Sequence, residues 1–138
     1  MVVEKTSMGR IWVVDDQPDV SRAMVALLRQ AGHRGTAFLS GESALAQLQN
    51  DIPDLMILDV MMPGLDGFDV LRAVREDPRT AKLPVIMFSA VSDPSRIAHA
   101  MARGATDYWV KASFDFSQLE AKINEHIADT NSDPARSA

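Results

Sequence analysis

Short apolar runs alternate with amphipathic segments along almost the whole of this chain. The runs are rich in aliphatic and β-branched residues, which is typical of buried strands, and they lie at 11–14, 36–39, 55–58, 85–88 and 106–110. Apolar residues at helical spacing follow each run: over 18–31, around Leu45 and Leu48, over 67–76, between Asp93 and Gly104, and over 116–127. Parallel strands need right-handed crossover connections, which place helices on both faces of the sheet. The alternation therefore predicts an α/β fold, a doubly wound sandwich of five βα units around a five-stranded parallel sheet.

Residues that begin and end helices stand at the boundaries between these segments. Pro18 suits the first turn of the first helix, and Gly32 is the expected stop after it. Ser40 and Asp66 are the expected N-caps of the second and third helices, and Asp93 caps the fourth. No internal repeat or second core is visible, so we expect one domain.

The two ends of the chain lack this pattern. We expect residues 1–9 to form a flexible leader, residues 10–128 the folded domain, and residues 129–138 a disordered tail or clipped linker. The N-terminus has no apolar core typical of a signal peptide, and no apolar stretch approaches the roughly 20 residues of a membrane span. We therefore expect no membrane insertion.

Composition narrows the class of function. Cysteine is absent, which excludes disulfides and thiolate metal sites and fits a cytoplasmic location. The net charge is −5, and no run of basic residues interrupts the chain. Binding to nucleic acid depends on clustered lysine and arginine, so we expect this chain not to bind nucleic acid directly.

Polar residues follow four of the five predicted strands. They are the pair Asp15-Asp16, then Asp59, Ser89 and Lys111, and parallel strands would bring them to the sheet edge where open α/β folds bind ligands. Three carboxylates within ~4 Å of one another would repel by about 4 kcal/mol per pair at an effective dielectric constant of about 20, so they should recruit a cation. Oxygen ligands favour Mg²⁺, Mn²⁺ or Ca²⁺. A lysine and a hydroxyl beside that cation are suited to bind a phosphoryl group, and Asp59 is then the candidate nucleophile that accepts it as an aspartyl phosphate.

Four motifs, in this order along the chain, resemble the receiver domain of two-component response regulators. They lie at 13–16, 57–67, 84–90 and 104–111, and the resemblance extends from about Arg10 to Ala128. It implies a flavodoxin-like, CheY-like fold and a phosphorylation-dependent signalling switch in a phosphorelay. Such a domain is not a turnover enzyme, although it catalyses its own phosphotransfer and dephosphorylation.

The resemblance also implies a role for each residue of the site. Asp59 corresponds to the phosphoacceptor, which takes the phosphoryl group from a sensor histidine kinase or a small phosphodonor. Asp15 and Asp16 correspond to the acidic pair that holds Mg²⁺ together with Asp59, and the backbone carbonyl of Met61 corresponds to a further ligand. Mn²⁺ is an alternative ion.

Three further residues correspond to those that sense the phosphoryl group. Lys111 resembles the lysine that pairs with it, Ser89 the switch hydroxyl that moves toward it, and Tyr108 the aromatic residue that follows inward. The implied partners are a sensor kinase or phosphotransfer protein and a downstream protein target, and a phosphorylation-linked dimer is left open. The kinase, the target and the phosphoryl lifetime do not follow from these residues.

The sequence departs from the family pattern directly after the lysine. Most members continue into a proline, often in cis, whereas this chain has Ala112, and the loop is about one residue longer. A cis bond before alanine would cost ~2.5–4 kcal/mol, against ~0.5–1 before proline. Either a trans bond in a rearranged loop or a strained cis bond is therefore expected.

Other functions fit the chain less well. A phosphohydrolase of the haloacid-dehalogenase type needs an acid two residues after the nucleophile, where this chain has Met61. An FMN site needs a loop rich in Ser, Thr and Gly after the first strand, where this chain has an acidic loop at 15–19. A cobalamin site needs a histidine two residues after Asp59, where this chain has Met61. A receiver-like scaffold or connector that is never phosphorylated is the remaining alternative, and the complete set of acids, hydroxyl and lysine argues against it.

Overall fold

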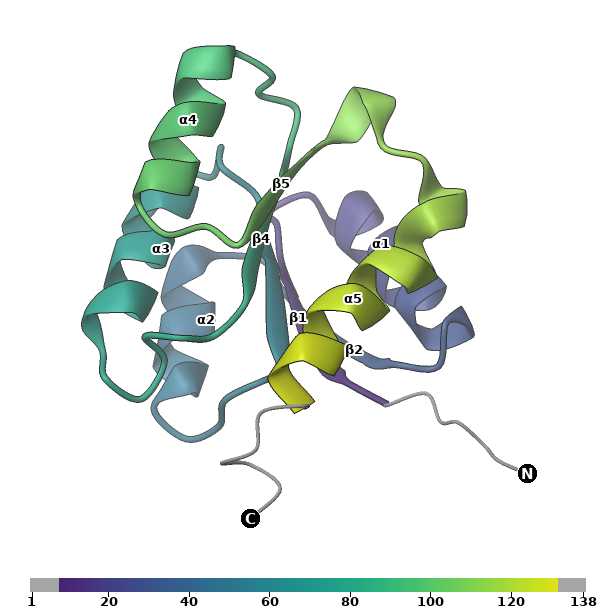
Figure 1. The fold of residues 1–138 in the computed structure, drawn as a ribbon. Helices are drawn as coiled ribbons and strands as arrows, with labels where there is room; N and C mark the ends of the chain where they lie inside the picture. The colour runs from purple at the N-terminus through teal and green to yellow at the C-terminus, as the bar shows by residue number, and fades with distance from the viewer. Residues whose placement is uncertain (1–7, 132–138) are drawn as a thin grey trace.

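The chain forms one parallel sheet with helices on both sides, as the alternation predicts (Figure 1). The computed structural model describes residues 8–131, with the side chains of residues 8–127. The strands are β1 Arg10–Val14, β2 Arg34–Phe38, β3 Leu55–Leu58, β4 Val85–Ser89 and β5 Asp107–Val110. The helices are α1 Pro18–Gln30, α2 Gly41–Leu48, α3 Gly67–Glu76, α4 Pro94–Ala102 and α5 Leu119–Asn131. Two short 3-10 helices, η1 Lys111–Ser113 and η2 Phe116–Gln118, connect β5 to α5.

The sheet has two buried faces, each covered by its own set of helices. Figure 1 shows α1 and α5 on one face, and α2, α3 and α4 on the other. Residues alternate between these faces along β1, so that Ile11 and Val13 pack toward α1 and α5 while Trp12 and Val14 pack toward α2 and α3. The strand order is β2-β1-β3-β4-β5, so the chain adds β2 on one side of β1 and then adds β3, β4 and β5 on the other side. The sheet order therefore reverses between β1 and β3. Doubly wound folds bind ligands at the carboxyl ends of the strands that flank such a reversal.

The capping residues begin the helices as predicted. Pro18 occupies the first turn of α1, and the side chains of Ser40, Asp66 and Asp93 each accept a hydrogen bond from a backbone N–H in the first turn of α2, α3 and α4. Asp66 forms a reciprocal capping box with Asp69, which fixes the start of the helix that follows the loop after β3.

Several element boundaries, and the two limits of the folded domain, differ from the sequence-based expectation. The second strand begins two residues earlier than expected, and the last helix begins as η2 and continues as α5 to Asn131. Gly9, the last residue of the predicted leader, is buried, and its carbonyl accepts a 2.9 Å hydrogen bond from the N–H of Arg34. Residues 129–131, at the start of the predicted tail, are helical, while residues 1–7 and 132–138 lie outside the described residues. No helix within residues 8–131 is both long and apolar enough to cross a bilayer.

His33, which directly precedes β2, is buried. Only 3% of its surface is exposed. Its Nδ1 accepts a 2.9 Å hydrogen bond from the N–H of Gly9, and its Nε2 lies 3.1 Å from Oδ1 of Asn124 on α5. The neutral ring with its proton on Nε2 satisfies both contacts. Burial lowers the pKa of His33, and the nearby Asn124 and Glu120 only partly oppose this shift.

We expect this histidine to make the fold sensitive to acid. The unfolded chain takes up a proton near the ordinary pKa of 6.5, whereas the folded chain does so only at lower pH, so stability falls as the pH drops below about 6.5. One such proton contributes a slope of at most about 1.4 kcal/mol per pH unit. Urea unfolding between pH 7.5 and 5.5 should show this slope in the wild type, reduced in His33→Gln and retained in His99→Gln, whose histidine is exposed. An equal slope in both variants would contradict the assignment.

Candidate functional site

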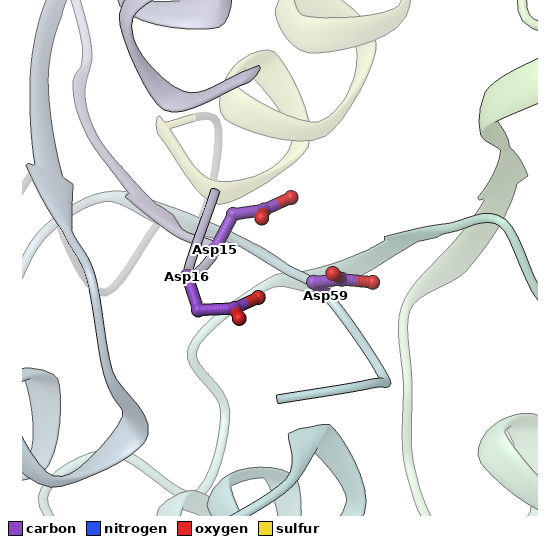
Figure 2. A group of neighbouring side chains, drawn as sticks. All are labelled: Asp15, Asp16 and Asp59. Atoms are coloured by element: carbon purple, nitrogen blue, oxygen red, sulfur yellow. The ribbon is translucent and has the colours of Figure 1, made fainter. Parts of the chain in front are cut away.

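Three carboxylates converge at the carboxyl ends of β1 and β3 (Figure 2). Asp15 and Asp16 follow β1, Asp59 follows β3, and one oxygen of each lies within 4.8 Å of the others. Sheet hydrogen bonds continue into these residues, because the N–H of Asp59 donates to the carbonyl of Val14 at 2.9 Å and the N–H of Asp15 donates to that of Phe38 at 3.0 Å. The sheet itself therefore brings together the acids singled out from the sequence.

The environment of Asp59 penalises its negative charge. The residue is 6% exposed, and its neighbour Asp15 is 2% exposed. Burial raises the pKa of Asp59, the charge of Asp15 raises it further, and Lys111 and the Ser89 hydroxyl oppose this shift only in part. A cation beside these oxygens would relieve both the desolvation cost and the repulsion.

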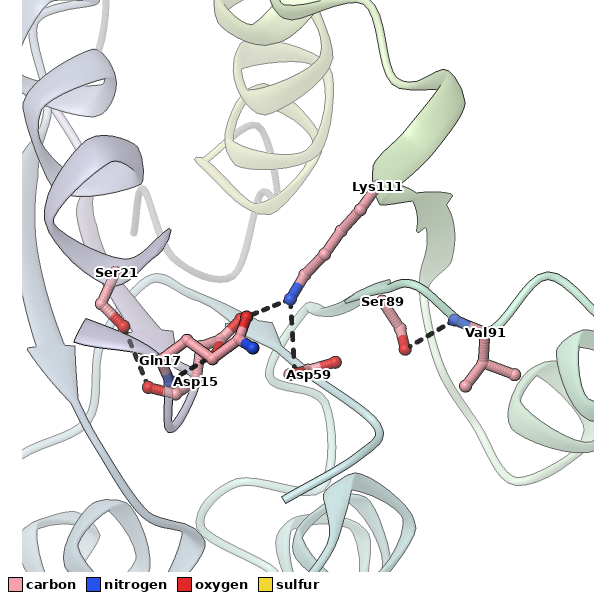
Figure 3. A network of polar contacts seen from close by, with 7 residues as sticks. All are labelled: Asp15, Gln17, Ser21, Asp59, Ser89, Val91 and Lys111. Carbon is pink, nitrogen blue, oxygen red and sulfur yellow. Dashed lines mark hydrogen bonds and ion pairs between the residues drawn. The ribbon is translucent and has the colours of Figure 1, made fainter. Parts of the chain in front are cut away.

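Lys111 reaches from the end of β5 across the site to two of the carboxylates. Its Nζ lies 2.8 Å from Oδ2 of Asp15 and 3.4 Å from Oδ2 of Asp59 (Figure 3). Burial alone would lower the pKa of Lys111, but the hydrogen bond to Asp15 and the charge of Asp59 outweigh it, so the pKa is raised. The ammonium group is therefore charged and lies beside the Asp59 carboxylate.

The sequence leaves the peptide bond after Lys111 either cis or trans, because no proline follows the lysine. No peptide bond between residues 8 and 131 is cis, so the Lys111–Ala112 bond is trans. The chain turns directly into η1 and, after Phe114, into η2. The rearranged loop with a trans bond is the alternative that this structure adopts.

Ser89 and Tyr108 meet at the backbone of Val91, in the loop between β4 and α4. The Ser89 hydroxyl accepts a 3.1 Å hydrogen bond from the N–H of Val91, and the Tyr108 hydroxyl donates a 2.6 Å hydrogen bond to its carbonyl. Figure 3 shows Ser89 between Asp59 and Val91. The two predicted switch residues thus both bond to the backbone of Val91, a connection that was not predicted from the sequence.

Two residues at the start of α1 shape the acidic pair and were not predicted. The N–H of Gln17 donates to Oδ1 of Asp15 at 3.0 Å, and the hydroxyl of Ser21 donates to the backbone carbonyl of Asp15 at 2.9 Å. Ser21 is 1% exposed. A serine at a buried position of an amphipathic helix was the available signal, because buried hydroxyls need a partner.

The donor set fits a hard divalent cation. Its carboxylate oxygens come from Asp15, Asp16 and Asp59, and the chain has no cysteine. Both oxygens of Asp15 are already engaged, one by Gln17 and one by Lys111, whereas Asp16 is half-buried beside them. Met61 stands two residues after Asp59 with its side chain turned to solvent, 59% exposed, so only its backbone is suited to a ligand role.

Comparisons with known proteins agree with this geometry. A sequence profile described as the response regulator receiver domain matches residues 11–124. The transcriptional regulatory protein AfsQ1 of Streptomyces coelicolor is 38% identical over 104 residues, which cover 75% of this chain and 45% of AfsQ1. The phosphate regulon transcriptional regulatory protein PhoB of Rhizobium meliloti is 37% identical over 116 residues, 84% of this chain and 51% of PhoB. This chain thus spans about half the length of these two relatives.

A solved structure gives the same result for the fold. The chemotaxis protein CheY4 of Vibrio cholerae superimposes with a TM-score of 0.79 at 28% identity, covering 86% of this chain and 98% of CheY4. The similarity therefore extends over nearly all of that chain and shows a flavodoxin-like fold.

Proposed function

The chain belongs to the response regulator receiver-domain family, and we propose that it is a phosphorylation-dependent switch whose phosphoacceptor is Asp59. The observation that carries this proposal is the position of Lys111, whose ammonium group lies between the carboxylates of Asp15 and Asp59. A charged lysine fixed beside a buried carboxylate is suited to neutralise a group that the carboxylate acquires.

The acidic cluster would hold Mg²⁺, or Mn²⁺ in its place. Asp16, Asp59 and the carbonyl of Met61 are the proposed direct ligands, and Asp15, with both oxygens engaged, is suited to act through a bound water. The bound ion would neutralise charge on the phosphoryl oxygens. The Asp59 carboxylate attacks the phosphorus of a phosphohistidine or of a small phosphodonor, and the donor's own oxygen or nitrogen departs with the bonding electrons.

Once Asp59 carries a phosphoryl group, Lys111 and Ser89 are the proposed side chains that contact it. The Ser89 hydroxyl accepts from the N–H of Val91, so its O–H is available to donate to a phosphoryl oxygen, and a shift of Ser89 toward that oxygen would move the loop residue that Tyr108 also contacts. The change would pass to the surface formed by α4, β5 and α5. Phosphorylation would thus act on the loop between β4 and α4.

The proposed partners follow from this switch. We expect this chain to act in the cytoplasm, where a sensor histidine kinase or phosphotransfer protein would supply the phosphoryl group. A protein target or a second copy of the chain would bind the altered surface. AfsQ1 and PhoB are named as transcriptional regulators, but the matched part is only about half of each. With a net charge of −5, we expect this chain not to contact nucleic acid directly. Because it is a receiver domain, we also expect it not to act as a turnover enzyme.

A receiver-like scaffold that acts without phosphorylation is less favoured. A scaffold has no need for a buried carboxylate whose pKa is raised by burial and by a second acid, since such a group costs stability. Buried acids with a lysine fixed beside them are typical of a functional site, which favours phosphoryl chemistry over a scaffold role.

The test is phosphorylation of the purified chain by acetyl phosphate. We expect intact-mass spectrometry to show one added phosphoryl group in the presence of Mg²⁺ and none after the metal is removed with a chelator. Beryllofluoride, a phosphoryl mimic, should shift the NMR signals of Ser89 and Tyr108. The shifts should also extend to residues along α4 and β5. Addition without Mg²⁺, or shifts confined to Asp59 and its neighbours, would contradict the switch.

A further inference from the structure

Four aromatic side chains form a cluster beside Lys111 on the face of the sheet covered by α1 and α5. This aromatic cluster consists of Phe88, Trp109, Phe114 and Phe116. Phe114 stacks on Trp109 with the ring centroids 4.6 Å apart and an angle of 23° between the planes. Phe114 also meets Phe88 edge-on at 5.7 Å and Phe116 at 5.0 Å. Phe114 is therefore in contact with each of the other three rings.

The cluster is joined to the site through the strands that carry it. Phe88 and Trp109 are paired neighbours on β4 and β5, and they immediately precede Ser89 and Val110. Lys111 leaves the same end of β5, and its Nζ lies 5.7 Å from the centre of the Phe88 ring. Its side chain thus passes over one ring of the cluster on its way to the carboxylates, in a cation–π arrangement.

The loop after Lys111 depends on this cluster because little else anchors it. Proline, which restricts the backbone after the lysine in most family members, is replaced here by Ala112. Among residues 112–118, Phe114 is the only one that is not exposed. Short 3-10 turns such as η1 and η2 have weak internal hydrogen bonding, so their position is set by tertiary contacts.

We propose that Phe114 is a positioning residue for Lys111. By stacking on Trp109 and packing against Phe88, it holds η1 in the orientation that directs the ammonium group to Asp15 and Asp59. Side-chain packing thereby supplies the restriction that a proline after the lysine supplies elsewhere. The consequence for phosphoryl binding rests on the proposed function, whereas the anchoring of η1 does not.

The substitution Phe114→Leu tests this proposal, since it keeps an apolar side chain and removes the stacked ring. We expect faster amide hydrogen exchange at 111–114 in the metal-free protein and binding of beryllofluoride about tenfold weaker, because small misplacements of a binding group have large effects on affinity. Mg²⁺ affinity should not fall, since Lys111 competes with the cation for the same carboxylates. Phe68→Leu is the matched control, because Phe68 packs edge-on against His99, outside the cluster.

A double-mutant cycle with Lys111→Ala separates positioning from general destabilisation. If Phe114 acts through the lysine, Phe114→Leu should weaken beryllofluoride binding by less than about twofold when Lys111 is already alanine. Equal losses in both backgrounds, or unchanged hydrogen exchange at 111–114, would overturn the proposal. A wild type that binds no beryllofluoride at all would instead contradict the proposed function, and the exchange measurement would still decide whether Phe114 anchors η1.

Discussion

Replacing Asp59 by asparagine is expected to abolish phosphorylation and, at the same time, to make the metal-free protein more stable. Asparagine has almost the same shape but no carboxylate to attack phosphorus, so no phosphoryl group should be added by acetyl phosphate in Mg²⁺. The raised pKa of Asp59 means that its charged form is disfavoured in the folded protein, by burial first and by Asp15 second. A neutral side chain removes both costs. Intact mass and urea unfolding measure the two effects.

The dependence on pH and metal gives the stability effect a distinctive form. A carboxyl whose pKa is raised by folding contributes stability below its unfolded pKa and loses that contribution as the pH rises through the folded pKa. The advantage of Asp59→Asn should therefore be present at neutral pH and disappear in acid. Saturating Mg²⁺ should also reduce it, because the metal stabilises the wild type more.

A matched control separates these effects from the loss of any carboxylate. Asp93→Asn keeps an N-cap on α4, outside the acidic cluster, so phosphorylation and stability should change little. If Asp59→Asn still acquired a phosphoryl group, Asp59 would not be the phosphoacceptor. If it were less stable than the wild type in the absence of metal, the charge of Asp59 would not be costly in the fold.

The sequence was sufficient to predict the fold and the members of the site because both depend on local patterns. Apolar runs and capping residues define the strands and helices, and parallel strands place their carboxyl ends at one edge. Asp15, Asp16, Asp59 and Lys111 meet for this reason. The prediction needed the ends of the strands that carry these residues, and the strand boundary that differed by two residues was the start of β2, which carries none of them.

Contacts that depend on loops or on distant segments of the chain could not be predicted in the same way. The shared hydrogen bonds of Ser89 and Tyr108 to Val91 depend on the path of a loop, which local propensity does not specify. His33 is buried because Gly9 and α5 happen to offer it partners from distant parts of the chain. The stacking of Phe114 on Trp109 likewise follows from where η1 and η2 turn, although Ala112 already signalled an altered loop.

Gly67→Ala is expected to damage both the fold and the phosphoryl site, although it adds a single methyl group. Gly67 begins α3, and its N–H donates a 2.8 Å hydrogen bond to the carbonyl of Val60. A Cβ at this position would lie 2.2 Å from the carbonyl oxygen of Asp59 and 2.7 Å from the Cα of Val60. These are backbone atoms directly at the phosphoacceptor, so the clash cannot be relieved by turning a side chain. We expect a loss of about 3 kcal/mol in the free energy of unfolding, and slower phosphorylation by acetyl phosphate.

Gly32→Ala shows what the same change does where space is open. Gly32 has φ +93° after α1, and an added Cβ would meet nothing within 4 Å, so only backbone strain opposes the alanine. That strain should cost about 1 kcal/mol, with the phosphorylation rate unchanged. The larger effect at Gly67 would then be due to the close approach of α3 to the end of β3, since Gly67 is not among the glycines with positive φ. Equal losses of stability in the two variants, or normal phosphorylation of Gly67→Ala, would show that the loop after Asp59 can move away and that its tight packing does not hold the carboxylate in place.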